Sequence, residues 1–437
     1  MRATSVLLIL ASLAAPSIAR SQVAGAPDDT LRIDLLEAYR IARAGSWSVR
    51  AAGAKVNRAE GNRLAAREAL APAVSPAFRF TTHRDRLQNT EGEFLDVDKQ
   101  SARSGASLLL AWSPSEIIWK GAAASAEVEA VEASAAATER DAMWETARRY
   151  VSLASAEESL NIAARLLATL EQLESEVASR VSLGLSAEVD RLRVQNQAER
   201  QRAELVRARV AREGAMAQLA FALGLAAPRP IRTAGLTAVE VSEAELPAAI
   251  EEAQGRRSDL AAARESAAAA RHERSSWTYG RLLPDLGAEL SPGLLGPTFD
   301  EGESTYDANV VVSWRIGPGG LFDLGRLRMS SAAVDLAEIR VSELESQIAS
   351  EVREVHAAAR AAAELEAAAA RSAEAAAKVF ELTLERDERG ISAPYELVQA
   401  SDAWLRSSRE LTQARAEAAL ARARLELVLE RIGDANH

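Results

Sequence analysis

The chain contains the same Ala-rich pattern twice, at a spacing of about two hundred residues. A Gly-x-Ser-Ala sequence starts at Gly184 and again at Gly390, so the two copies are 206 residues apart (390 − 184). Asp190 and Glu396, six residues after each glycine, keep the same spacing. Internal similarity at a fixed period indicates that one structural unit is present twice, and the fold must accommodate both copies.

The composition favours long helices over a bulky globular core. Of the 437 residues, 48% are hydrophobic when alanine is counted, but only 4% are aromatic, which suits helices that pack through small side chains. The net charge of −11, with Lys and Arg interleaved among Glu, argues against nucleic acid as a partner. Because cysteine is absent, we expect neither disulfides nor a lipid anchor on an N-terminal Cys.

The N-terminus has the layout of a secretory signal peptide. Met1 and Arg2 precede a short apolar run over residues 6–15, followed by Pro16 and a small-x-small site that ends at Ala19. We expect cleavage after Ala19; the alternative is a buried N-terminal helix. No later stretch approaches the roughly twenty apolar residues of a spanning helix, so a crossing of the membrane would require β-strands in a closed barrel.

Two long helical hairpins are predicted, one in each repeat. No Pro or Gly occurs between Gly121 and Val181, which corresponds to roughly 90 Å of continuous helix. Apolar residues within it alternate at steps of four and three, as in a coiled coil: Leu166, Leu170, Leu173 and Val177. The returning helix is expected over 187–223, and the second repeat copies the pair over 324–386 and 394–431.

The hairpin turns and the shorter helices have recognisable end signals. Gly184 and Gly390 permit a left-handed residue where the first helix of each hairpin ends, and Ser186 or Ser392 could cap the next helix. Two shorter helices open the repeats, expected over 33–70 and 246–282, each stopped by a proline.

Two β-hairpins are predicted, placed equivalently in the repeats. The strands are expected over 76–82 and 104–112 and over 286–290 and 307–315, joined by exposed loops over 84–102 and 291–304. Alternation gives each hairpin an apolar face, which we expect to face lipid with the other face toward a lumen: Leu108, Leu110, Trp112, Val310, Val312 and Trp314. The alternative is a pair of surface hairpins on a periplasmic protein.

The order helix, strand, strand, long helix, turn, helix therefore occurs twice. The predicted fold class is mainly α with a small β part. The predicted organisation is a signal peptide over 1–19, an N-terminal extension over 20–30, the first repeat over 31–224, a linker over 225–243, the second repeat over 244–433 and a C-terminal tail over 434–437.

This order resembles the TolC-like outer-membrane efflux protein family over nearly the whole mature chain. The segments that carry the resemblance are Leu35-Leu36-Glu37-Ala38, Arg257-Ser258-Asp259-Leu260, Leu283-Pro284-Asp285-Leu286, Val312-Ser313-Trp314, Leu321-Phe322-Asp323-Leu324-Gly325 and the two Gly-x-Ser turns. The resemblance implies a homotrimer in the cell outer membrane, with a 12-stranded β-barrel in outer-membrane lipid and a periplasmic helical tunnel. It further implies an exit duct of a tripartite efflux or type I secretion system, which works passively with a periplasmic adaptor and an inner-membrane pump.

The resemblance also implies roles for particular residues. Glu396 matches a position where carboxylates of three chains narrow the tunnel, and Gln399 stands where another acid occurs in the family. Asp190 is the equivalent of Glu396 in the first repeat, and we expect it to pair with Arg386, Arg389 or Arg191. The alternative is that both carboxylates are solvated and stabilised by the helix dipole. The residues expected to contact the adaptor are Gly184, Leu185, Ser186, Gly390, Ile391 and Ser392.

Other functional classes find little support in the sequence. The four histidines have no metal-ligand spacing, and there is no nucleotide or nucleophile motif, so we expect no enzyme, no cofactor and no metal site. The competing function is a periplasmic coiled-coil adaptor or structural spacer that does not enter the membrane. An adaptor typically has one helical hairpin between Gly- and Val-rich β-domains, whereas this chain has two hairpins. The sequence leaves drugs, metals, siderophores and proteins open as substrates.

Overall fold

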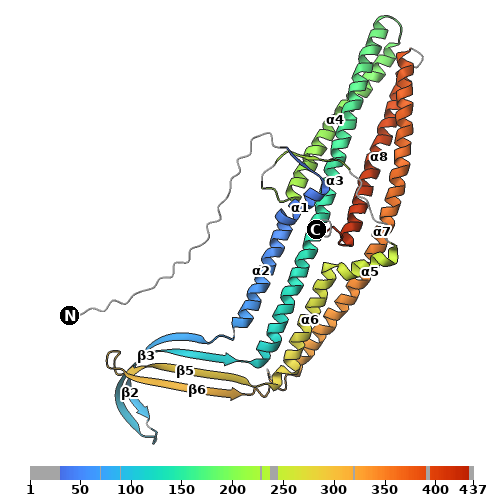
Figure 1. Cartoon of the computed structure of the whole chain (residues 1–437). Helices are drawn as coiled ribbons and strands as arrows, with labels where there is room; N and C mark the ends of the chain where they lie inside the picture. Colours follow the sequence, from blue (N-terminus) through green and yellow to red (C-terminus); the bar gives the residue numbers. More distant parts are fainter. Residues whose placement is uncertain are drawn as a thin grey trace, which may run out of the picture.

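The chain is an elongated, mostly helical molecule with a small sheet at one end (Figure 1). The computed structural model describes residues 30–68, 70–88, 90–226, 229–236, 245–317, 320–389 and 394–432. The ends of two helical hairpins lie at the opposite end from the sheet. None of the described helices is sufficiently long and apolar to span a membrane.

The two predicted helical hairpins are confirmed. In the first repeat α3 (Gly121–Ser182) is followed by α4 (Glu188–Ala222), and in the second α7 (Leu324–Glu388) is followed by α8 (Pro394–Val428). The apolar coiled-coil residues predicted in α3 are buried, and they pack partly against the other repeat. Leu173 and Val177 of α3 share a cluster with Val194 of α4 and Leu397 of α8. The coiled-coil spacing therefore joins the two hairpins to each other as well as the helices within one hairpin.

The opening helix of each repeat is broken, and the prediction of one continuous helix was wrong in both. The first consists of α1 (Leu35–Gly45) and α2 (Trp47–Glu68), and the second of α5 (Leu246–Arg256) and α6 (Ser258–Thr278). Ser46 between α1 and α2 is buried and extended, with ψ at 146°. A Cβ on Gly224, which has φ at +69°, would lie 2.1 Å from the carbonyl oxygen of Gly45. The first break thus lies where a distant segment crosses the helix.

The region between the repeats contributes to the core. β1 (Leu31–Ile33) pairs in parallel with β4 (Ile231–Thr233), and Ile33 and Ile231 are both buried in one cluster with residues of α3 and α4. The expectation of a helix starting at residue 33 was therefore wrong. Residues 237–244 lie outside the described part of the chain.

The main sheet is antiparallel, in the order β2-β3-β5-β6. Its strands β2 (Ala73–Gln88), β3 (Phe94–Trp112), β5 (Asp285–Gly296) and β6 (Glu303–Ser313) are longer than predicted, because most of the expected loops continue as strand. Charged pairs across the first hairpin accompany this extension, with 3.1 Å between Arg84 Nε and Asp98 Oδ2. At its other end β6 stops at Ser313, so Trp314 lies outside the strand.

The helices next to the sheet follow the order of the strands to which they lead. α3 packs against α2 on one side and α6 on the other, and α6 packs against α7. The arrangement α2-α3-α6-α7 therefore continues β2-β3-β5-β6. The result is a single curved layer with α2 and β2 at one edge and α7 and β6 at the other.

Candidate functional site

The turn of the first hairpin is an exposed, glycine-dependent tip. Gly184 has φ at +71°, a conformation that favours glycine, and Leu185 N–H donates to the carbonyl of Arg180 at 2.8 Å. The flanking Leu183 and Leu185 are 72% and 75% exposed. Ser186 does not cap the next helix as predicted, because α4 has Ala187 as its N-cap without a side-chain hydrogen bond. The tip presents apolar side chains to solvent, which is a feature of contact surfaces.

The turn of the second hairpin lies outside the described residues. Predictions for Gly390, Ile391 and Ser392 therefore concern a segment whose structure is not described. The described helix ends next to the two turns are in contact, because Arg180 of α3 binds Asp387 of α7.

The carboxylates expected at the constriction both lie in first turns of helices. Asp190 is in the first turn of α4 and Glu396 in that of α8, whereas Gln399, one turn further, is exposed. Asp190 pairs with Arg193 of its own helix at 3.4 Å. The expected pairing was therefore wrong. Arg191 instead binds Glu188 at 2.9 Å, and Arg389 binds Glu385 at 3.6 Å.

An ion pair that the sequence did not reveal connects the two repeats near their tips. Arg180 of α3 contacts Asp387 of α7, with 2.9 Å between Nη2 and Oδ2 and 3.1 Å between Nη1 and Oδ1. Asp387 is only 1% exposed. The hydrogen bond between Arg180 and Asp387 raises the pKa of the Arg180 guanidinium above its ordinary value. Because the partners are 207 residues apart (387 − 180), only the packing of the two hairpins could reveal the pair.

Removal of this cation should loosen the hairpin ends. In Arg180→Met the Asp387 carboxylate stays buried without its partner, which typically costs about 2–5 kcal/mol. We expect amide hydrogen exchange in the last turns of α3 and α7 to accelerate at least about tenfold. Arg193→Met is the matched control, because it removes an exposed pair worth at most about 1 kcal/mol. Equal exchange in wild type and Arg180→Met would contradict a stabilising role.

A larger ionic cluster lies midway along the molecule, where four helices meet. Asp259 of α6 accepts from Arg257 at 2.6 Å and lies 3.5 Å from Arg140 of α3. Arg140 also contacts Glu430, just beyond α8, at 3.1 Å, and Arg257 contacts Glu351 of α7 at 2.8 Å. Burial opposes ionisation of Asp259, but the two arginines outweigh it and lower its pKa to about 2. The Arg-Ser-Asp-Leu segment noted in the sequence thus joins both repeats.

The sheet has one apolar and one polar face. Residues paired across an antiparallel sheet share a face, and the register aligns Trp112 with Leu286 and Val312. The residues aligned on this face are Val74, Phe78, Leu108, Leu110, Trp112, Leu286, Leu290, Leu294, Val310 and Val312. The apolar residues predicted for the two hairpins, except Trp314 beyond the strand end, therefore form one surface that combines both repeats.

The opposite face carries polar and charged side chains. Arg103 of β3 reaches across β5 to Asp307 of β6, with 2.5 Å between Nη2 and Oδ2. Arg79, Glu289 and Asn309 share this face. A sheet with one apolar and one hydrated face is suited to separate an apolar medium from water. Among the described residues, no group of three or more His, Asp or Glu side chains is positioned to hold a metal ion.

Comparisons with known proteins agree with this architecture. Residues 249–430 match the family model described as outer membrane efflux protein. The Campylobacter jejuni CmeC outer membrane channel shares 13% identity and a TM-score of 0.77, covering 90% of this chain and 85% of that one. A Pseudomonas aeruginosa membrane protein shares 18% identity at a TM-score of 0.76, and the match covers 90% of this chain and 93% of that one. The Vibrio cholerae outer membrane protein VceC shares 17% identity at a TM-score of 0.73, and the match covers 90% of this chain and 95% of that one. Curated proteins give no match.

The duplicated helical hairpins and the two-faced sheet together form the fold of outer-membrane channels. Residues 249–430 match the outer membrane efflux protein model, and the resemblance of the chain to the TolC-like outer-membrane efflux protein family is confirmed.

Proposed function

We propose that the chain is the outer-membrane exit duct of a tripartite efflux or type I secretion system. Three copies would form a homotrimer, in which twelve strands close a β-barrel and the long helices form a periplasmic tunnel. Substrates delivered by an inner-membrane pump and a periplasmic adaptor would pass through it without catalysis. An N-terminal signal peptide over 1–19 would export the chain, and the two repeats would occupy 31–224 and 244–433.

The single observation that carries this proposal is the continuous layer of four strands and four helices with open edges. A four-stranded sheet leaves unpaired backbone groups on β2 and β6, and within a bilayer such groups must be paired. Three chains joined edge to edge satisfy them and give about twelve strands, which encloses a wide lumen. The polar face with Arg103 and Asp307 would line that lumen.

The hairpin ends are the proposed gate and docking region. Glu396, with Gln399 one turn further and Asp190 in the first repeat, would line the narrow end of the tunnel. The exposed Leu183 and Leu185 would contribute to the surface that contacts the adaptor.

Conductance of purified protein in planar bilayers tests this function. We expect cation-preferring channels in wild type, and Glu396→Ala should reduce cation preference at least about twofold, because three carboxylates leave one constriction together. Glu374→Ala, at an exposed position 14 residues before the end of α7 (388 − 374), controls for a general change in charge. Protein that remains in solution and forms no channels would favour a periplasmic spacer. Channels whose ion selectivity is unchanged in Glu396→Ala would exclude the proposed carboxylate ring but not the channel function.

A further inference from the structure

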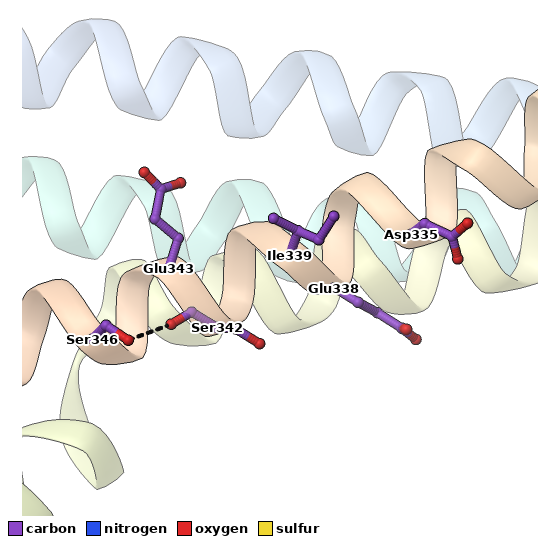
Figure 2. A pocket seen from close by; sticks show the side chains of 6 residues that line it. All are labelled: Asp335, Glu338, Ile339, Ser342, Glu343 and Ser346. Atoms are coloured by element: carbon purple, nitrogen blue, oxygen red, sulfur yellow. Dashed lines mark hydrogen bonds between the residues drawn. The ribbon is translucent and has the colours of Figure 1, made fainter.

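Two charged regions of the described surface differ in how far their charges are paired. The groove along α7 is acidic (Figure 2), but Glu338 contacts Arg271 at 3.0 Å and Glu343 contacts Arg340 at 2.6 Å. The polar face of the sheet instead carries an excess of cations on β2 and β3. A cation without a protein partner is free to bind an anionic ligand, so the polar face is the better candidate for a binding site.

Two arginines face each other on the polar side of the first β-hairpin. Arg79 of β2 and Arg103 of β3 are direct cross-strand partners, which places their Cβ atoms about 5 Å apart. Like charges in such a position repel each other, so the pair favours an anion that both side chains can share. Arg79 is exposed, and among the described residues it forms no ion pair. Its guanidinium is therefore available to a ligand.

The orientation of Arg103 depends on a gap between the side chains beside it. Gly105 and Gly293 form the next cross-strand pair on the same face. A Cβ on Gly105 would lie 2.4 Å from the carbonyl oxygen of Pro292, so a larger residue does not fit there without a shift. Arg103 crosses this gap to reach Asp307 through Nη2. Because a guanidinium has five N–H donors, Arg103 keeps donors for a ligand while Asp307 holds it in place.

The neighbouring rows of the hairpin add further donors and no acid. Thr81 pairs with Ser101 and His83 with Lys99, all on the polar face and toward the end of the hairpin. The acids of this face lie on β5 and β6, except for Asp85 beyond His83. The polar face is thus divided into a basic strip on the first hairpin and an acidic strip on the second.

We propose that Arg79 and Arg103 form an anion-binding site for the phosphate or carboxylate groups of transported solutes. The inference rests on the proposed function, in which the polar face lines the lumen, and it adds a substrate chemistry to it. Each guanidinium can bind such a group through two parallel N–H bonds. Three copies would contribute both arginines to one ring, the kind of arrangement that attracts anions in pores. The carboxylates proposed at the hairpin ends would act on cations at the opposite end of the tunnel.

Inhibition of ion conductance by inorganic triphosphate tests this site. Triphosphate is added to either side of planar bilayers that contain the full-length protein. In Arg79→Gln and in Arg103→Gln, we expect the concentration for half-maximal inhibition to rise at least about tenfold. Arg84→Gln is the matched control, because Arg84 also belongs to β2 but lies on the opposite face and pairs with Asp98. Wild-type channels that triphosphate does not inhibit, or equal inhibition of all variants, would overturn the site.

Isothermal titration calorimetry of triphosphate with the detergent-solubilised full-length protein separates this inference from the proposed function, because it requires no channel. Binding that is at least about tenfold weaker in Arg79→Gln and Arg103→Gln, but unchanged in Arg84→Gln, supports the site. If the same protein forms no channels, the exit duct fails and the site stands. Channels without triphosphate binding overturn the site alone. Loss of trimers in Arg79→Gln with unchanged triphosphate binding would assign Arg79 to a contact between copies and overturn the site.

Discussion

Val312→Arg is expected to reduce the amount of protein assembled in the outer membrane several-fold, whereas Val311→Arg should assemble almost normally. The two residues are neighbours on β6 and similarly exposed, at 51% and 55%, but they lie on opposite faces of the sheet. An arginine on the lipid-facing side of a barrel costs about 2–4 kcal/mol near the bilayer midplane. On the polar face the same side chain would remain hydrated near Glu289 and Asn309.

Quantitative membrane fractionation, with trimers detected on unheated gels, measures this effect. The pair of variants controls for charge, size and position along the strand, so only the face differs. Equal assembly of the two variants would contradict a lipid-facing role for the surface of Leu108, Leu110 and Val310.

Asp259→Asn should lower the free energy of unfolding by about 3 kcal/mol. The substitution keeps the shape of the side chain but leaves Arg257 and Arg140 in a mostly buried site without their shared carboxylate, and loss of one buried partner typically costs 3–5 kcal/mol. Asp141→Asn is a suitable control, because its carboxylate also contacts Arg140 but is well exposed. Urea unfolding monitored by circular dichroism measures both.

The same carboxylate predicts a dependence on pH. The pKa of Asp259 is about 2 in the folded chain, below its ordinary value of 3.8. A lowered folded pKa stabilises the fold above pH 3.8, and this contribution is lost as the pH falls toward 2. The difference corresponds to about 2.5 kcal/mol. Wild type should therefore lose more stability than Asp259→Asn over this range, and parallel pH profiles would contradict the assignment.

Much of the architecture could be predicted from local patterns. The long uninterrupted runs from Gly121 and the seam through Leu166 indicated the helical hairpins, because side chains four and three residues apart share a helix face. Alternation in the segment around Val310 indicated an apolar strand face for the same kind of reason. The strands proved longer than predicted because polar, charged residues over 84–102 pair across the hairpin, and their composition resembles that of a loop.

Features that depend on distant residues could not be predicted in this way. The break at Ser46 occurs where Gly224 crosses the helix, and no proline or glycine pair marks the break at Arg257. Asp190 was expected to pair with Arg386 or Arg389 of the other hairpin or with Arg191, but it binds Arg193, while Arg180 makes the contact between hairpins. The charges of these residues alone allow either set of ion pairs.

The sequence by itself determined the repeat, the lengths of the hairpins and which strand residues are apolar, because these follow from periodicity within one element. The tertiary structure decided that β3 lies beside β5, so that both repeats share one sheet. It also decided that Asp387 is buried against Arg180 of the other repeat and that the half-buried Asp259 meets Arg140 of another helix. The physical reason is that charge and periodicity specify what kind of neighbour a side chain needs. Which neighbour it meets depends on packing between segments that are as far apart as Arg140 and Glu430, 290 residues along the chain.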